Sequence, residues 1–140
     1  MPRTEATVDL LRAVPLFADL SKSELRLVAS ITKPLDYEPG APVVTEGERT
    51  GRFFVIVDGD AEVLVSGRFV RQLGPGDFFG ELALLDDEPR SATVAAMNSL
   101  STLSIAAFNF RSLLKSNASI TYKVLLALCQ RLRTAERSRL

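Results

Sequence analysis

Turn-forming residues interrupt the middle of the chain about every eight to twelve residues, and this spacing constrains the fold more than any other feature. Asp58-Gly59 is a strong tight-turn signal, because glycine adopts a positive φ without steric cost. The other turn signals are Pro39-Gly40, Glu46-Gly47, Ser66-Gly67 and Gly74-Pro75-Gly76-Asp77. The runs between them, rich in Val, Phe, Leu and Thr, predict about eight short strands over residues 32–106, among them 43–45, 53–57, 61–65, 69–73, 92–96 and 101–105.

Amphipathic helices are expected before these strands. Val8–Val14 carries apolar residues at helical spacing, and Pro15 should end that helix at the preceding residue. Ser21 and Glu24 form a capping-box pattern, because the serine side chain can accept from the backbone while the glutamate reaches back. A second short helix should therefore begin there and continue through Ile31.

The helical period returns after residue 106. A short helix is expected around Phe108 and Leu113, followed by the longest helix of the chain, which should run nearly to the C-terminus. Its apolar stripe recurs every four residues and could pack on the strands of its own chain or along a second copy. Cys129 broadens this stripe, so we expect it to be packed rather than reactive. The stripe consists of Ile120, Val124, Leu128 and Leu132.

The order of elements predicts a mainly β fold with flanking helices. The economical architecture is a small double-sheet roll, with N-terminal helices over 1–31, strands over 32–106 and C-terminal helices over 107–140. We expect residues 1–140 to form a single domain, since no repeat or interior linker is visible.

Composition argues against several classes of function. The chain has no histidine, so metal sites and histidine-based catalysis lose their commonest member, and we expect neither an enzyme nor a metal or cofactor site. Lys and Arg balance Asp and Glu at 17 each, which gives no sign of a nucleic-acid or membrane partner. One cysteine, no long apolar run and a polar N-terminus favour a cytoplasmic protein without a membrane segment.

The connection over residues 74–96 is unusual for a strand connection. Three glycines lie among residues 74–80, and successive N–H groups at such a turn can bind an anion. The run 82–85 can form one helical turn beside them. Arg90 suits a phosphate and Glu81 suits a ribose hydroxyl, so together they describe a pocket for a sugar carrying a phosphodiester. On spacing alone, Glu81 and Arg90 could instead be an exposed ion pair, and the glycines could only make turns.

These residues also resemble a known family. Phe79-Gly80-Glu81-Leu82-Ala83-Leu84 with Pro89-Arg90-Ser91-Ala92-Thr93-Val94 is similar to the phosphate-binding cassette, here 79–94, of cyclic-nucleotide-binding domains. That family includes catabolite-activator-type regulators, regulatory parts of cyclic-nucleotide-dependent kinases and channel sensors. The resemblance runs from Leu16-Phe17 to the last helix, through Glu46-Gly47, Phe54, Ile56, Gly59, Val63 and Leu73-Gly74-Pro75-Gly76-Asp77-Phe78-Phe79. It implies a double-stranded β-helix, or jelly roll, with a long C-terminal lid helix.

The resemblance also implies roles for individual residues. Glu81 would accept from the ribose 2′-hydroxyl, Arg90 would neutralise the cyclic phosphate, and Ser91 would contact the phosphate or a guanine amino group. Ser91 therefore leaves both cAMP and cGMP open as ligands. The full set of expected binding residues is Phe79, Gly80, Glu81, Leu82, Ala83, Arg90, Ser91 and Ala92, in which the backbone N–H groups of Leu82 and Ala83 add hydrogen bonds.

The last helix would close over the base as a lid, with Leu128, Arg131, Leu132 and Ala135 as candidate contacts. Ala135 and Glu136 stand where the catabolite activator has a Thr-Ser pair that contacts the base, so base recognition in that style is not expected. Arg131 or Arg133 could instead contact the purine, or both could lie on a solvated helix face.

The resulting hypothesis is a cyclic-nucleotide sensor in which the ligand repositions the last helix, and a homodimer partner or an effector detects that movement. Direct DNA binding is not expected, since the sequence stops where activator-type regulators begin their DNA-binding unit. The alternative is a structural or interaction module that keeps the roll without binding nucleotide. A cupin-like enzyme is disfavoured by the absence of histidine.

Overall fold

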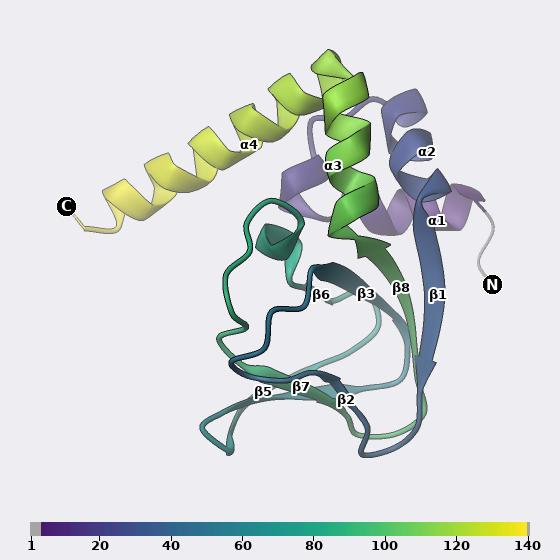
Figure 1. Ribbon diagram of the computed structural model, residues 1–140, viewed down its shortest axis with the longest axis vertical. Coiled ribbons are helices and arrows are strands. Elements are labelled where there is room, and N and C mark those ends of the chain that lie inside the picture. Colours follow the sequence, from purple (N-terminus) through teal and green to yellow (C-terminus); the bar gives the residue numbers. More distant parts are fainter. Residues whose placement is uncertain (1–3, 140) are drawn as a thin grey trace. The chain divides into compact units, whose positions relative to one another are not determined.

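Helices and strands separate into two units in the computed structural model, which describes residues 4–139. The strand unit comprises residues 32–109. The helical unit comprises the two ends of the chain, residues 4–31 and 110–139 as far as they are described. Figure 1 labels the elements of both. That residues 1–140 act as a single domain stays a prediction.

The helical unit is built on the capping box expected from the sequence. Glu24 donates its backbone N–H to Ser21 Oγ at 3.2 Å, and Ser21 donates its own N–H to Glu24 Oε1 at 2.8 Å. Both capping bonds start α2 at the predicted place. The helices of the chain are α1 (Thr4–Arg12), η1 (Pro15–Phe17), α2 (Lys22–Ser30), α3 (Ala107–Ser116) and α4 (Ala118–Arg137), η1 being a 3₁₀ turn and α3 beginning inside the strand unit.

The first helix ends earlier than expected. Its last residue is Arg12 rather than Val14, and Pro15 opens η1. Proline is well suited to the first position of a helical turn, because its missing N–H has no partner there in any case. Phe17 at the end of η1 packs on Phe110 of α3, with ring centroids 5.7 Å apart.

Only the first half of the apolar stripe on α4 is buried. Ile120 and Val124 are buried, and the first part of the helix packs on η1. Leu132, by contrast, is 65% exposed, and Cys129 is exposed too. The expectation of a packed Cys129 was wrong, because the helix continues beyond its contacts within the helical unit. Among the described residues, no helix combines the length and apolar character required to cross a membrane.

The strand unit contains eight strands in two antiparallel sheets, and the predicted jelly roll is confirmed. One sheet has the order β1-β8-β3-β6 and the other β2-β7-β4-β5. The strands are β1 (Thr32–Tyr37), β2 (Pro42–Val44), β3 (Arg52–Asp58), β4 (Ala61–Val65), β5 (Arg68–Leu73), β6 (Phe78–Phe79), β7 (Thr93–Ala96) and β8 (Leu100–Ala106).

The core of the strand unit is filled from both sheets. Alternate side chains of a strand point to opposite faces, so each sheet buries one face against the other. Phe54, Ile56 and Leu100 come from the first sheet, and Val44 and Val94 from the second. The cassette begins at the edge of this core, directly after β6.

The Asp58-Gly59 turn connects the two sheets rather than closing a hairpin. β3 ends at Asp58 in one sheet and β4 begins at Ala61 in the other. Gly59 has φ +89°, and a Cβ there would overlap the carbonyl oxygen of Ser99. Glycine is therefore required both for the turn and for the close approach of β8.

Candidate functional site

The cassette starts on a stacked aromatic pair. Phe79 of β6 lies opposite Phe54 of β3 in the sheet, and the two rings stack with centroids 5.1 Å apart and an interplanar angle of 18°. Gly80 follows with φ +83° and caps the 3₁₀ turn η2 (Glu81–Leu84). The short helical turn expected after the glycines is thus present, although it begins one residue earlier than the apolar run. Phe54 is buried and Phe79 half-buried, and their stacking anchors the start of the cassette to the sheet.

Gly80 and Arg90 lie against each other. A Cβ built on Gly80 would overlap Arg90 Nη1 and lie 3.1 Å from the carbonyl oxygen of Arg52. Gly80 is therefore constrained by its positive φ and by the guanidinium that occupies the space beside it. The ten-residue separation in the sequence is closed by the turn η2 and the loop that follows it.

The guanidinium of Arg90 is held by main-chain carbonyls. Its Nη2 donates to the carbonyl of Thr50 at 2.8 Å and also to that of Arg52. Its Nε is buried, and in residues 4–139 it has no hydrogen-bond partner. Burial lowers the pKa of the Arg90 guanidinium from its ordinary value. A partly buried cation with an unused donor has the charge and the hydrogen-bonding capacity that favour an anion.

The reading of Arg90 as an exposed surface charge does not fit this position. An exposed arginine would keep its donors in water, whereas Arg90 is half-buried between β3 and η2 with its charge on two carbonyls. Gly80 is also needed for more than the turn, because the guanidinium of Arg90 fills the space that a side chain at this position would occupy.

A second segment, residues 45–51 between β2 and β3, holds the cassette in place. We call it the 45–51 loop. Arg90 donates its backbone N–H to the carbonyl of Glu48 at 2.8 Å, and Gly47 donates to the carbonyl of Arg90 at 2.8 Å. Arg49 donates to the carbonyl of Asp87. The sequence analysis identified only the Glu46-Gly47 turn here, because contacts between segments about 40 residues apart leave no local signal.

The remaining predicted cassette residues are placed as follows. Glu81 is half-buried at the start of η2. The backbone N–H of Ala83 donates to the carbonyl of Gly80 at 3.0 Å, so it is already used within the turn. Leu82 and Ser91 are exposed, and Ala92 packs against the core between the sheets.

The candidate lid residues are on α4, which belongs to the helical unit. Leu128 is half-buried, and Arg131, Leu132 and Ala135 are exposed. Their role over a bound base stays a prediction.

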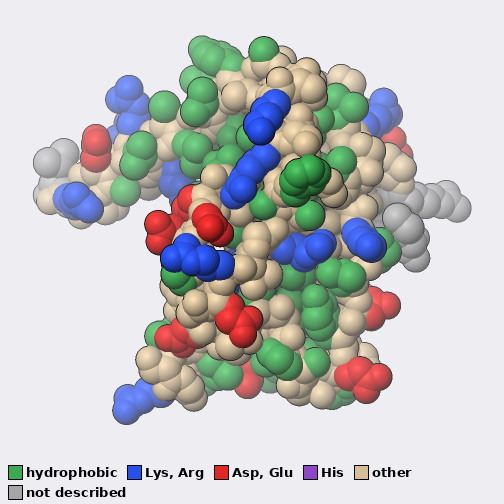
Figure 2. Space-filling model, viewed as in Figure 1, with side chains coloured by type: hydrophobic (Ala, Val, Ile, Leu, Met, Phe, Trp, Pro, Cys, Tyr) green, Lys and Arg blue, Asp and Glu red, His purple; other side chains and the backbone are tan. Residues whose placement is uncertain are grey.

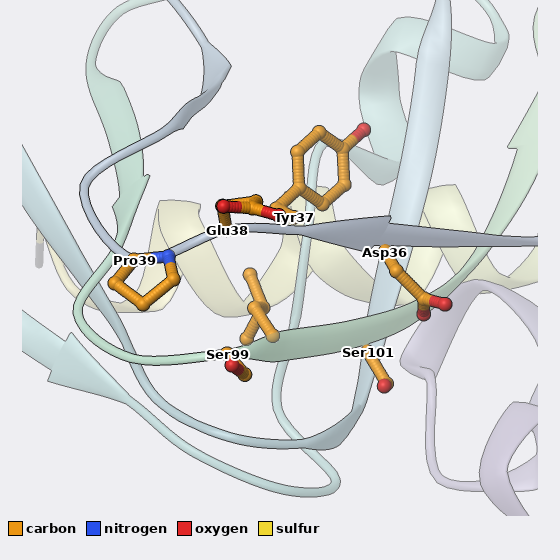
Figure 3. A pocket seen from close by; sticks show the side chains of 7 residues that line it. Asp36, Tyr37, Glu38, Pro39, Ser99 and Ser101 are labelled. Atoms are coloured by element: carbon orange, nitrogen blue, oxygen red, sulfur yellow. The ribbon is translucent and has the colours of Figure 1, made fainter.

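A separate pocket of about 400 Å³ lies at the far end of β1 and contains none of the predicted site residues. Figure 3 shows the side chains of Asp36, Glu38, Ser99 and Ser101 among those that line it. Burial raises the pKa of Tyr37, which also lines it, and the nearby charge of Arg52 partly opposes this. Two carboxylates make the pocket unfavourable for an anionic phosphodiester. Within residues 4–139, no group of three or more His, Cys, Asp or Glu side chains is placed to hold a metal ion.

Comparison with protein families gives one match. A family model described as "Cyclic nucleotide-binding domain" matches residues 34–117, which include the 45–51 loop, the cassette and every strand after β1.

Individual relatives agree with this match. The chain is 46% identical over 87 residues to a cAMP-dependent protein kinase regulatory subunit of Mycosarcoma maydis, an alignment that covers 59% of this chain and 17% of the relative. It is 39% identical over 111 residues to a cyclic nucleotide-gated potassium channel of Rhizobium etli, covering 79% and 31%. The chain therefore spans less than a third of the length of these curated relatives.

Among solved structures, the chain is similar to the N-terminal domain of a transcriptional regulator from Streptomyces coelicolor A3(2). The TM-score is 0.86 at 26% sequence identity, and the match covers 94% of this chain and 96% of that one. The likeness thus extends over both the strand and the helical elements.

Proposed function

Because this chain belongs to the cyclic-nucleotide-binding domain family, we propose that it binds cAMP or cGMP through the cassette, residues 79–94. The observation that carries this proposal is the half-buried guanidinium of Arg90, whose Nε is buried and unpartnered within residues 4–139. Removing a charge from water is unfavourable unless an opposite charge or full hydrogen bonding replaces the water. The cyclic phosphate supplies both.

The cassette residues take distinct parts of the ligand in this proposal. Arg90 neutralises the phosphate, and the backbone N–H groups of Leu82 and Ala83 face the phosphate oxygens, Ala83 sharing its N–H with Gly80. Glu81 accepts from the ribose 2′-hydroxyl beside the Gly80 backbone, and Ser91 contacts the phosphate or a guanine amino group. The close approach of Gly80 and Arg90 supports this division, since it puts the start of η2 beside the arginine.

We further propose that the nucleotide acts as a signal rather than as a substrate. Ligand binding repositions α4 so that Leu128, Arg131, Leu132 and Ala135 cover the base. The ligand can shift the equilibrium between the two positions of the helix only by as much as its affinities for the two positions differ. The exposure of three of these four residues supports the proposal, because they have surface available for a ligand.

We propose that a second copy of the chain contacts α4 and responds to this movement. Four residues of α4 follow one another at spacings of three, four and three residues, which is the spacing of core positions in a two-stranded coiled coil: Tyr122, Leu125, Cys129 and Leu132. Tyr122 is 63% exposed, Leu125 54% and Leu132 65%, and Cys129 is exposed as well. Figure 2, which has the same view as Figure 1, shows hydrophobic side chains on the surface at the upper left, where α4 lies. An effector protein is the other candidate partner.

Calorimetric titration with cAMP and with cGMP tests nucleotide binding. Arg90→Ala should weaken binding by about a hundredfold or more, because the phosphate loses its main counter-charge. Arg71→Ala is the matched control, since Arg71 is an exposed arginine on β5. It should bind like the wild type.

The same titration separates the alternative, a structural module that does not bind nucleotide. If the folded wild-type protein takes up neither nucleotide at about 100 µM, the sensor proposal fails and the alternative stands. Unchanged affinity in Arg90→Ala would overturn the assigned role of that arginine.

A further inference from the structure

Two arginines cross in opposite directions between the 45–51 loop and the loop of residues 85–92 that joins η2 to β7. Arg90 reaches from the second loop to the carbonyls of Thr50 and Arg52. Arg49 reaches from the first loop to the carbonyl of Asp87. Between these side-chain contacts, the backbone of Arg90 exchanges two hydrogen bonds with Gly47 and Glu48. Each loop is thus held by a guanidinium of the other.

The loop that carries Arg90 has an electrostatic problem of its own. It carries three neighbouring acidic residues just before Arg90, all of them exposed: Asp86, Asp87 and Glu88. Like charges at neighbouring positions repel one another, and they also repel an approaching phosphate. Arg49 brings a positive charge to this acidic stretch, with its Nη1 4.0 Å from Asp87 Oδ2.

We propose that Arg49 is a positioning residue for the nucleotide site, acting through its hydrogen bond to the Asp87 carbonyl. This inference rests on the proposed function and deepens it. Arg49 fixes the loop 85–92 from its outer end, and the backbone bonds at Arg90 fix it from its inner end. With both ends held, the guanidinium of Arg90 stays on its two carbonyls beside Gly80 before any ligand arrives, which lowers the ordering cost of binding.

The directional contact is the bond to the carbonyl, not the ion pair. The carboxylate of Asp87 is 82% exposed and 4.0 Å from Arg49, so water screens the attraction. Asp87→Ala removes the carboxylate and keeps the carbonyl. It therefore separates the two contacts, and if the carbonyl matters it should bind nucleotide no more weakly than the wild type.

Hydrogen exchange on the ligand-free protein tests the positioning role without reference to ligand. In Arg49→Ala, the amides of Gly47 and Arg90 should exchange about ten times faster than in the wild type, because local opening of the loop becomes easier. Arg49→Lys keeps one donor to the carbonyl and should lie between the two. Exchange in Asp87→Ala should match the wild type. Unchanged exchange at both amides in Arg49→Ala would overturn the proposal.

Titration with cAMP and cGMP then tests the link to the site. Arg49→Ala should weaken binding roughly threefold to tenfold, mainly through faster dissociation, with partial recovery in Arg49→Lys. In an Arg90→Lys background the effect should shrink, since Arg49 acts through Arg90. Faster exchange with unchanged affinity would show that Arg49 only holds the loop, and the proposal would fail. If Arg49→Ala exchanges faster but the wild-type protein binds neither nucleotide, the proposed function fails, whereas the role of Arg49 in holding the loop remains.

Discussion

Gly80 and Arg90 determine each other's surroundings at the scale of single residues. The backbone of Gly80 has φ +83°, and the space where a side chain would begin is taken by the guanidinium of Arg90. Any larger residue at position 80 would have to displace that guanidinium from the carbonyls of Thr50 and Arg52. The geometry of the proposed phosphate position therefore depends on the absence of one methyl group.

Gly80→Ala should lower the free energy of unfolding by about 2–4 kcal/mol, because strain at positive φ adds to the overlap with Arg90. Gly67→Ala is the matched control, since Gly67 has φ +76° but open space around its Cβ position, and it should cost only about 1–2 kcal/mol. Urea denaturation of both variants measures the difference. Equal losses would mean that the guanidinium moves aside without cost. Nucleotide affinity should fall in Gly80→Ala and stay unchanged in Gly67→Ala.

At the scale of elements, the capping box of α2 also joins two helices. Glu24 caps α2 and in addition accepts from Lys123 Nζ and from Ser119 Oγ of α4, each at 2.6 Å. The contacts with Lys123, Ser119 and Ser21 lower the pKa of Glu24 from 4.5 to about 2. A residue predicted only to begin a helix thus also ties α2 to the first turns of α4.

Glu24→Gln should remove a contribution to stability that depends on pH. Because the pKa of Glu24 is lower in the folded chain than in the unfolded one, the stabilisation is complete above about pH 5 and is lost as pH falls towards 2. Glutamine keeps the shape of the cap, so the variant isolates the charge. The unfolding free energies of the wild type and Glu24→Gln, measured between about pH 7 and pH 2, should differ most near neutral pH and converge in acid.

The control for Glu24 is Glu5→Gln. Glu5 also pairs with two cations, Lys22 and Arg26, which lower its pKa, but all three side chains are largely exposed. Its removal should therefore change stability only slightly at any pH. A constant difference between wild type and Glu24→Gln down to pH 2 would show that the carboxylate carries no native-state ionic contact.

At the scale of the whole molecule, the proposed nucleotide site and the proposed lid helix belong to different units. The strand unit holds the cassette and the 45–51 loop, and the hydrogen bonds that join the two lie within this unit. The helical unit holds α4, which buries Ile120 and Val124 and leaves Tyr122, Leu125 and Leu132 exposed. The chain passes between the units at residues 31–32 and again within α3. We propose that ligand binding in the first unit is communicated to the second along this chain.

Cross-linking through Cys129 tests both the dimer and the movement of α4, since Cys129 is the one cysteine of the sequence. A short bis-maleimide should join two copies in the wild type, because facing core positions of a coiled coil lie close together. Leu125→Asp should abolish the product, since it buries a charge in the seam. Leu27→Asp, at an exposed leucine of α2, should not. Saturating cAMP or cGMP should change the yield.

Two results would contradict these proposals separately. A wild-type protein that light scattering shows to be monomeric at about 100 µM has no such seam. A yield that stays constant when nucleotide binds would mean that α4 does not move.

Local chemistry made much of the fold predictable from the sequence. Turn residues such as Asp58-Gly59 restrict φ within one or two positions, and Ser21 with Glu24 caps a helix within three. These signals require no distant partner, which is why a roll of about eight strands and the start of α2 were predicted. The predicted cassette residues were identified from the resemblance of the segment 79–94 to a known family, which is visible in the sequence because Gly80, Glu81 and Arg90 are close together along the chain.

Tertiary structure decided what surrounds those residues. The carbonyls of Thr50 and Arg52, the bond from Arg49 to Asp87 and the burial of the Arg90 Nε depend on segments about 40 residues apart. The two contacts of Glu24 with α4 span 95 and 99 residues. Tertiary packing also decided the exposure of Cys129, because α4 continues beyond the contacts that bury Ile120. A sequence pattern specifies local conformation, whereas the partner of a backbone carbonyl or a long side chain is chosen only when the packed chain brings distant segments together.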